Sequence, residues 1–226
     1  MSTRTILEVN MQNITYNFEN LKQKLHKNYT EGKTTEEVAI VEERFTHTLG
    51  VVETAEKLAR MYGADVEKAR VAALLHDCAK FYKYNDFVNK YGIKIDEEIL
   101  QYPKIIHSFI GAYIAKLEYG INDEDILNAI KYHTVAKPEM TLLEEVIYIA
   151  DQIEPNRGDY INEIRNIIDS AISLHENNQI LKVGKKSLDI ALIEILRAKI
   201  RRVKERDEHV YFLTEKAYEW YIKKAL

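Results

Sequence analysis

One apolar helical run in this chain ends on a histidine and an aspartate that stand side by side. Residues 72–80 read Ala72-Ala73-Leu74-Leu75-His76-Asp77-Cys78-Ala79-Lys80. A histidine–carboxylate pair in an apolar setting costs free energy unless something compensates it, and a bound metal is the commonest compensation. The doublet therefore predicts a metal site at the end of a helix that begins after its cap, Asp65, and runs to about Lys80.

Further ligand side chains lie upstream and downstream of the doublet, each on a segment with helical spacing. They are His47, His107, His133 and Asp151. Imidazole and carboxylate are suitable ligands for Fe, Mn, Zn and related ions. Together with His76 and Asp77 they are enough for two metal ions. Adjacent helical residues point about 100° apart, so one ion would lie between the directions of His76 and Asp77, and the two oxygens of Asp77 can also bridge two ions.

Hydrophobic residues recur at helical spacing along most of the chain, and no segment shows the strict alternation of a strand. Glycines and capping residues divide this pattern into separate helices. The expected helices are Val41 to Tyr62, Asp65 to about Lys80, His107 to Tyr119, Asp123 to His133 after an Asn122 cap, Thr141 to about Glu154, Asp159 to His175, Ser187 to Glu208, and Thr214 to Ala225. The sequence predicts an all-α protein, with an accessory N-terminal segment over residues 1–35 and one helical domain over 36–226.

The composition narrows the class of protein. The 226 residues are 46% hydrophobic and include only 8 Gly and 3 Pro, which favours long helices with short connections. A net charge of −4 argues against binding DNA through bulk electrostatics. The single cysteine, Cys78, excludes an internal disulfide. No apolar run is long enough to span a membrane and no signal peptide is visible, so we expect a soluble cytoplasmic protein.

Two cationic residues are spaced to lie beside the metal ligands. Lys80 is one helical turn from both His76 and Asp77, and Arg44 is one turn before His47. Each can place a positive charge next to an anion that the metals bind. The alternatives are structural: Lys80 can complement the dipole of its helix, and Arg44 can pair with Glu43.

The order of the ligands resembles the HD-domain metal-dependent phosphohydrolases, and the two additional histidines resemble the subset of that superfamily that holds two metals. Short strings around the ligands are similar to the bacterial YqeK-type family. These strings are Arg44-Phe45-Thr46-His47-Thr48-Leu49-Gly50-Val51, His76-Asp77-Cys78-Ala79-Lys80, His107-Ser108, Tyr132-His133-Thr134 and Ile149-Ala150-Asp151-Gln152-Ile153-Glu154-Pro155-Asn156-Arg157. The resemblance covers roughly Val41 to Leu226 and implies an HD-domain helical bundle around a dinuclear metal site.

Members of that family hydrolyse diadenosine tetraphosphate symmetrically to two ADP and are described as di-iron proteins. The resemblance therefore implies a small-molecule nucleotide substrate and two Fe ions, with Mn or Zn as alternatives. It also assigns the ligands: one ion would be held by His47, His76, Asp77 and Asp151, and the other by His107, His133 and a bridging Asp77. A metal-bound hydroxide would attack a central phosphorus. A homodimer is compatible with the resemblance.

The resemblance also implies contacts to the substrate. Lys80, with Asp77, would be catalytic, because its ammonium neutralises negative charge that develops on the phosphoryl oxygens. The expected substrate-binding residues are Arg44, Lys80, Ser108, Thr134 and Arg157. Arg157 follows a Pro-Asn turn, so a solvated loop residue is an equal alternative.

Other functions stay open at this point. The site can hydrolyse another nucleotide or phosphoester, or carry out oxygenase chemistry with a mixed-valent di-iron pair. A third alternative is a binding module that senses a nucleotide without turnover. The basic run from Lys199 to Arg206 is most simply a solvated helix face, with a phosphate- or RNA-binding stripe as the alternative.

Overall fold

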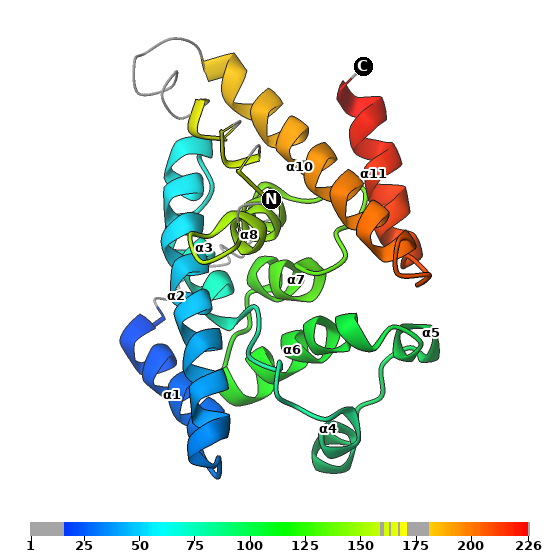
Figure 1. The fold of residues 1–226 in the computed structure, drawn as a ribbon. Helices are drawn as coiled ribbons and strands as arrows, with labels where there is room; N and C mark the ends of the chain where they lie inside the picture. The colour runs from blue at the N-terminus through cyan, green and yellow to red at the C-terminus, as the bar shows by residue number, and fades with distance from the viewer. Residues whose placement is uncertain (1–15, 159–160, 163, 167, 171–180, 226) are drawn as a thin grey trace, which may run out of the picture.

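The structure, a computed structural model, describes residues 16–158, 161–162, 164–166, 168–170 and 181–225. In these ranges the chain forms helices joined by turns, and no strand occurs among them (Figure 1). The helices are α1 (Phe18–Thr30), α2 (Thr35–Tyr62), α3 (Val66–Leu75), α4 (Tyr84–Tyr91), α5 (Glu97–Leu100), α6 (Pro103–Tyr119), α7 (Glu124–Tyr132), α8 (Leu142–Ile153), α10 (Leu181–Lys204) and α11 (Phe212–Ala225). The predicted all-α class is confirmed.

Helix α8 lies at the centre of the molecule, between α2, α3 and α7, and α10 packs across it (Figure 1). Its residues 146–150 are consecutive and fully buried. A helix that is hydrophobic all round can be stable only when other helices cover every side. Helix α2 packs on α3 and α8, α6 packs on α7, and α10 pairs with α11. The core therefore surrounds α8, and the buried polar residues of this helix face the neighbouring helices.

Capping residues explain where the central helices begin. Thr141 and Glu144 form the predicted capping box at the start of α8, and Thr34 and Glu37 form another at the start of α2. Helix α2 therefore begins at Thr35, earlier than the expected Val41.

The cap of α7 differs from the expected one by a single residue. The side chain of Asp123 accepts hydrogen bonds from the backbone N–H groups of Asp125 and Ile126. Asn122 instead donates its side-chain amide to the carbonyl of Gly120, at 3.2 Å. Asp123 is therefore the N-cap, and the prediction of Asn122 was wrong.

The helix that carries the His-Asp doublet ends earlier than predicted. Helix α3 stops at Leu75 and His76 is its C-cap, whereas the spacing of apolar residues had placed the end near Lys80. Beyond it the backbone forms turns with hydrogen bonds between residues three apart, from Cys78 N–H to Leu75 O at 3.0 Å and from Lys80 N–H to Asp77 O at 2.8 Å. The doublet and Lys80 therefore lie in a chain of turns, not on one helical face.

Several other helix ends also differ from expectation. Helix α6 begins at Pro103, before the expected His107, because proline favours the first helical position. Helix α10 spans Leu181–Lys204, where Ser187 to Glu208 was expected, and the short helices α4 and α5 were not predicted. The helix expected over 159–175 falls largely on residues outside the described part of the chain.

Helix α1 belongs to the expected accessory segment, and it packs on α2 and α3. Leu25 and Tyr29 are buried there. The Tyr29 hydroxyl donates a hydrogen bond to the carbonyl oxygen of Asp77, at 2.7 Å. The described part of this segment therefore supports the turn that carries the doublet.

Within the part of the chain that the structure describes, we find no helix with both the length and the apolar character needed to cross a bilayer.

Candidate metal centre

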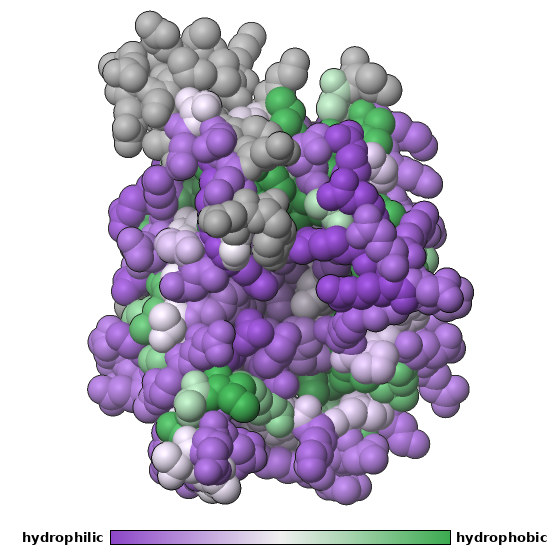
Figure 2. Space-filling view, in the orientation of Figure 1, coloured by the Kyte–Doolittle hydropathy of each residue, from purple (hydrophilic) through white to green (hydrophobic). Residues whose placement is uncertain are grey.

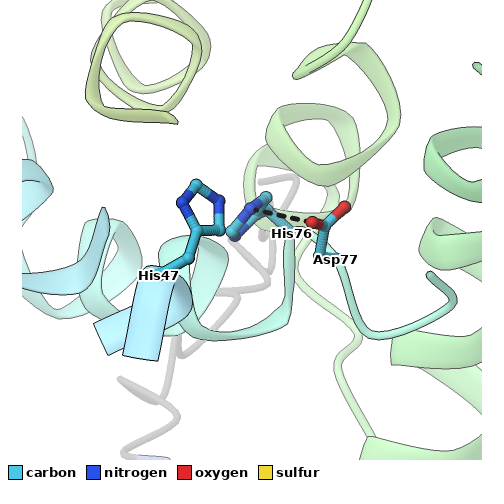
Figure 3. Close-up of side chains that lie close together, drawn as sticks. All are labelled: His47, His76 and Asp77. Carbon is cyan, nitrogen blue, oxygen red and sulfur yellow. Dashed lines mark ion pairs between the residues drawn. The ribbon is translucent and has the colours of Figure 1, made fainter. Parts of the chain in front are cut away.

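The six predicted ligands converge from separate parts of the fold. His47 comes from α2, His76 and Asp77 from the turn after α3, His107 from α6, His133 from the C-cap of α7, and Asp151 from α8. None is more than 8% exposed. Figure 3 shows His47 and the doublet facing the same interior space between the helices.

Asp77 lies between the two groups of histidines. Its Oδ1 is 3.0 Å from His107 Nε2 and 3.5 Å from His133 Nε2. Its Oδ2 is 3.6 Å from His76 Nε2 (Figure 3). On the other side, Asp151 Oδ1 is 3.1 Å from His47 Nε2 and 3.7 Å from His76 Nε2.

Two groups of three residues have ligand atoms that lie within 4.8 Å of one another. One group is His47, His76 and Asp77, and the other is Asp77, His107 and His133. Both contain Asp77. The geometry therefore offers two adjacent cation positions with one carboxylate in common, and Asp151 beside the first.

The ends of α3 and α7 fix the orientation of two of the imidazoles. His76 Nδ1 lies 2.6 Å from Ala73 O, and His133 Nδ1 lies 2.7 Å from Ile130 O. These carbonyls belong to last helical turns, where backbone oxygens need partners. Because a carbonyl only accepts, Nδ1 must carry the proton in both rings, and the Nε2 lone pair faces the centre.

Buried polar atoms at the centre lack hydrogen-bond partners among the described residues. They include Nε2 of His47, Nε2 of His76 and Oδ1 of Asp77. A buried acceptor without a partner costs about 1–3 kcal/mol. Nearby nitrogens and oxygens meet these atoms at contact distance but without hydrogen-bond geometry. Lone pairs from imidazole and carboxylate that converge in this way fit a divalent cation.

The protonation states are those that metal binding requires. Burial lowers the pKa of His76 to about 3, although the charges of Asp77 and Asp151 oppose the shift. Burial would raise the pKa of Asp77, but the nearby imidazoles of His76, His107 and His133 outweigh it and hold that pKa well below its usual range. The carboxylate is therefore ionised and the His76 imidazole neutral near pH 7.

Three cationic side chains surround the two carboxylates. Arg44 Nη1 is 3.0 Å from Asp77 Oδ2, not paired with Glu43, and Arg157 Nη2 is 2.6 Å from Asp151 Oδ1. Lys80 Nζ is 3.8 Å from Asp77 Oδ1 and 3.4 Å from His107 Nε2. Burial lowers the pKa of Lys80, an effect that Asp77 opposes.

These cations line an open cavity beside the metal ligands. Its volume is about 420 Å³, and Arg44, His47, Lys80 and Arg157 all contribute to its wall. Figure 2 shows hydrophilic residues over the middle of the face that it draws and along α10. An anionic ligand could therefore enter from solvent and meet positive charge before reaching the ligands.

The hydroxyls of Ser108 and Thr134 join α6 to the turn after α7. Ser108 Oγ donates to Ile105 O at 2.8 Å and lies 2.7 Å from Thr134 Oγ1. Since Ser108 has one proton, Thr134 must be the donor between them. Both protons are therefore used inside the protein, and the expected substrate contact of these residues stays a prediction.

Lys199 was not singled out from the basic run, yet it lies close to the centre. Its ammonium donates to the carbonyl of Thr134 and lies 5.6 Å from the centroid of the Tyr148 ring. Burial lowers its pKa to about 8. The sequence signal for this position was the spacing of Lys199 one helical turn after Ile195 and Leu196. Both of these residues are buried, so Lys199 lies on the same inward face of the helix.

Comparison with known proteins gives a consistent picture. The model of the HD domain family matches residues 44–156, a range that includes all six predicted ligands. The protein named bis(5'-nucleosyl)-tetraphosphatase, symmetrical, from Bacillus subtilis (strain 168) is 37% identical over 186 residues, covering 81% of this chain and 91% of that protein. Its namesake from Staphylococcus aureus (strain NCTC 8325 / PS 47) is 37% identical, covering 80% of this chain and 87% of its own.

A solved structure from Clostridium acetobutylicum, described as an HD superfamily hydrolase involved in NAD metabolism, has a similar fold. Its TM-score is 0.73 at 31% sequence identity, and the match covers 93% of this chain and 99% of that one. The likeness therefore extends well beyond the ligand strings.

Proposed function

The chain belongs to the HD domain family, together with relatives named symmetrical bis(5'-nucleosyl)-tetraphosphatases, and we propose that it cleaves diadenosine tetraphosphate into two ADP. The observation that carries the proposal is the position of Asp77, which belongs to both groups of metal-ligand atoms. Such a centre suits hydrolysis of a phosphoric anhydride, because two adjacent cations can act on one phosphoryl group.

The distances support an assignment of the residues that would hold the metals. His47, His76, Asp77 and Asp151 would hold the first ion, and Asp77, His107 and His133 the second. Iron is the metal we propose, with Mn or Zn as alternatives, because imidazole and carboxylate donors suit all three. When bound, two such ions supply Lewis-acid charge and lower the pKa of a water molecule that attacks phosphorus.

The cations of the cavity would bind the phosphate chain. Lys80 would lie beside the reacting phosphoryl group, since its ammonium is next to both Asp77 and His107. There its positive charge stabilises the negative charge that grows on the phosphoryl oxygens as ADP leaves. Because Lys80 lies in the turn after α3, the same turn positions a metal ligand and this charge.

Arg44 and Arg157 would exchange partners when metals bind. Each guanidinium now pairs with a carboxylate that would be a ligand, Asp77 or Asp151. A divalent cation draws on the same carboxylate oxygens and weakens these ion pairs. The planar guanidinium can then turn to phosphate oxygens, which match its paired donors. Such an exchange couples metal binding to substrate binding.

A nucleotide substrate also favours a cytoplasmic location, which we propose on that ground.

Product analysis after separate loading with Fe²⁺, Mn²⁺ or Zn²⁺ tests the function. The loaded protein is incubated with diadenosine tetraphosphate with and without dioxygen, and the nucleotides are separated by chromatography. We expect two ADP per substrate in both atmospheres. ATP plus AMP would contradict symmetrical cleavage, a requirement for dioxygen would favour oxygenase chemistry, and binding without turnover would favour a nucleotide sensor.

A further inference from the structure

One buried carboxylate next to the centre has no part in the ligand set described above. Glu154 is the C-cap of α8 and is fully buried. Its Oε1 lies 2.9 Å from His47 Nδ1, and its Oε2 accepts from Asn156 at 2.7 Å from the backbone nitrogen and 3.0 Å from the side-chain amide. A buried carboxylate is tolerated only when its oxygens are satisfied in this way.

The fold leaves a space for this carboxylate on α2. A Cβ atom added to Gly50 would lie 2.6 Å from Glu154 Oε2 and 3.1 Å from the side-chain nitrogen of Asn156. Any other residue at position 50 would therefore displace Glu154. Gly50 is one helical turn after His47 on α2, so the same helix carries the imidazole and the gap for its partner.

We propose that Glu154 is the positioning residue of His47, an inference that rests on the proposed metal centre. A carboxylate only accepts hydrogen bonds, so His47 Nδ1 must carry the proton. The lone pair is then on Nε2, which has no hydrogen-bond partner among the described residues and lies 3.1 Å from Asp151 Oδ1. Glu154 thus turns the ligand atom of His47 toward the first metal position.

Glu154 also makes the two metal positions unequal. The Nδ1 atoms of His76 and His133 face neutral backbone carbonyls, whereas that of His47 faces a negative charge. A charged acceptor forms the stronger hydrogen bond and makes the imidazole a better ligand. The position next to His47 therefore binds its ion more tightly than the position next to His107 and His133.

Glu154→Gln tests this proposal with little change in shape. Glutamine has one accepting oxygen, whereas Glu154 uses one oxygen for His47 and another for Asn156. If the amide nitrogen faces His47, the ring must protonate at Nε2 and can no longer bind a metal there. If the amide nitrogen faces Asn156, it meets the two N–H donors of Asn156, and the acceptor of the hydrogen bond from His47 is then neutral.

Two measurements follow the effect, and neither depends on turnover. Titration with Mn²⁺, followed calorimetrically, should show two steps in the natural protein, and Glu154→Gln should weaken the tighter step about 10- to 100-fold. The weaker step should shift less than about threefold, within the usual scatter of context. In the metal-free protein, ¹⁵N NMR of the imidazoles should show His47 protonated at Nδ1, and the variant should gain the Nε2-protonated form.

Matched variants separate positioning from packing. Asn156→Ala removes a contact of Glu154 but leaves its bond to His47, so the tautomer and the tight Mn²⁺ step should be kept. Gly50→Ala keeps the carboxylate but displaces it, so it should reproduce the effect of Glu154→Gln, and it serves as the test if that variant does not fold. Circular dichroism and melting temperature check the fold of each variant.

The possible failures can be told apart. Natural protein that binds no Mn²⁺ would contradict the metal centre, while the imidazole NMR would still decide the role of Glu154 in the metal-free chain. Two normal binding steps and an unchanged His47 tautomer in both Glu154→Gln and Gly50→Ala would overturn the inference and leave the proposed function standing.

Discussion

At Asp77, one carboxylate meets histidines from three separate parts of the fold and the guanidinium of Arg44. Its two oxygens face different neighbours, so the residue links the two halves of the centre. Its interior position would be unfavourable for a lone charge. The surrounding donors, and in the proposed function two cations, compensate it.

Asp77→Asn should remove both ions and the activity together. The amide keeps the shape but loses the negative charge and one accepting atom, so neither position retains its shared ligand. Turnover should fall by more than about 100-fold, since even outer partners of a metal ligand cost 10- to 100-fold. Metal analysis and a kinetic assay on the same sample measure this. Asp86→Asn, on the exposed surface of α4, is the control, and full metal content with full activity in Asp77→Asn would contradict the bridge.

Lys80→Met should lower kcat while the metals stay bound. Methionine fills a similar volume without the ammonium, so the charge next to the reacting phosphoryl group is lost. A fall of about 10²- to 10³-fold is expected, the usual cost of a group that stabilises charge in the transition state. Lys83→Met, in an exposed position nearby, should behave as the natural protein. A kcat within twofold of normal in Lys80→Met would show that Lys80 is structural.

At this scale the ligand residue types could be predicted, because imidazole and carboxylate side chains are rare in apolar helical segments. Their orientation could not be predicted, since Ala73 and Ile130 contribute backbone carbonyls that carry no sequence signal. Glu154 was visible as a carboxylate one turn after Asp151, but only the structure shows its bond to His47.

Among the elements, the turn after α3 determines how the centre is built. Its tight hydrogen bonds hold His76, Asp77 and Lys80 in directions that a continuous helix would not give. Helix α1 supports this turn from outside through Tyr29.

Apolar spacing predicts helices well but not their last turns. At the end of α3, Leu75 and Cys78 are both buried and both fit a helical pattern. Caps were the better guide to the starts, as Thr141 shows.

Tyr29→Phe should destabilise the fold by removing the hydrogen bond to the carbonyl of Asp77. The change keeps the ring and removes one of the two donors to this carbonyl, which still accepts from the backbone N–H of Lys80. The free energy of unfolding should therefore fall by about 0.5–1.5 kcal/mol, the usual net contribution of one hydrogen bond. Urea denaturation of the metal-free protein measures it. Tyr113→Phe is the matched control, because Tyr113 is 40% exposed. Equal stability of the two variants would mean that α1 does not support the turn.

For the whole molecule, the balance of charge around the centre is the main property that composition could not reveal. The net charge of −4 describes an acidic protein, yet Arg44, Lys80, Arg157 and Lys199 gather at one place. Long-range packing brings them together, so no local pattern predicts it. The homodimer stays a prediction, which sedimentation would test.

Lys199→Met should stabilise the metal-free protein below pH 8 and have little effect above pH 10.5. Burial lowers the pKa of Lys199 to about 8, helped by Arg202, Arg157 and Lys80 and opposed by Asp151. In the unfolded chain this lysine has its ordinary pKa near 10.5. Between pH 8 and pH 10.5 the unfolded chain therefore binds more protons than the folded protein, so the stability of the natural protein rises with pH across this window. The gain at pH 7 is at most about 3 kcal/mol.

Melting temperatures at pH 7 and pH 10.5 measure this difference. Lys204→Met, at a position 62% exposed, controls for the loss of one positive charge. A stabilisation by Lys199→Met that does not change with pH would mean that Lys199 keeps its ordinary pKa in the folded protein.

Anomalous diffraction from crystals soaked in Mn²⁺ tests the central claim most directly. We expect two peaks with Asp77 between them, one among His47, His76 and Asp151 and the other between His107 and His133. A single peak, or peaks away from these side chains, would contradict a dinuclear centre bridged by Asp77.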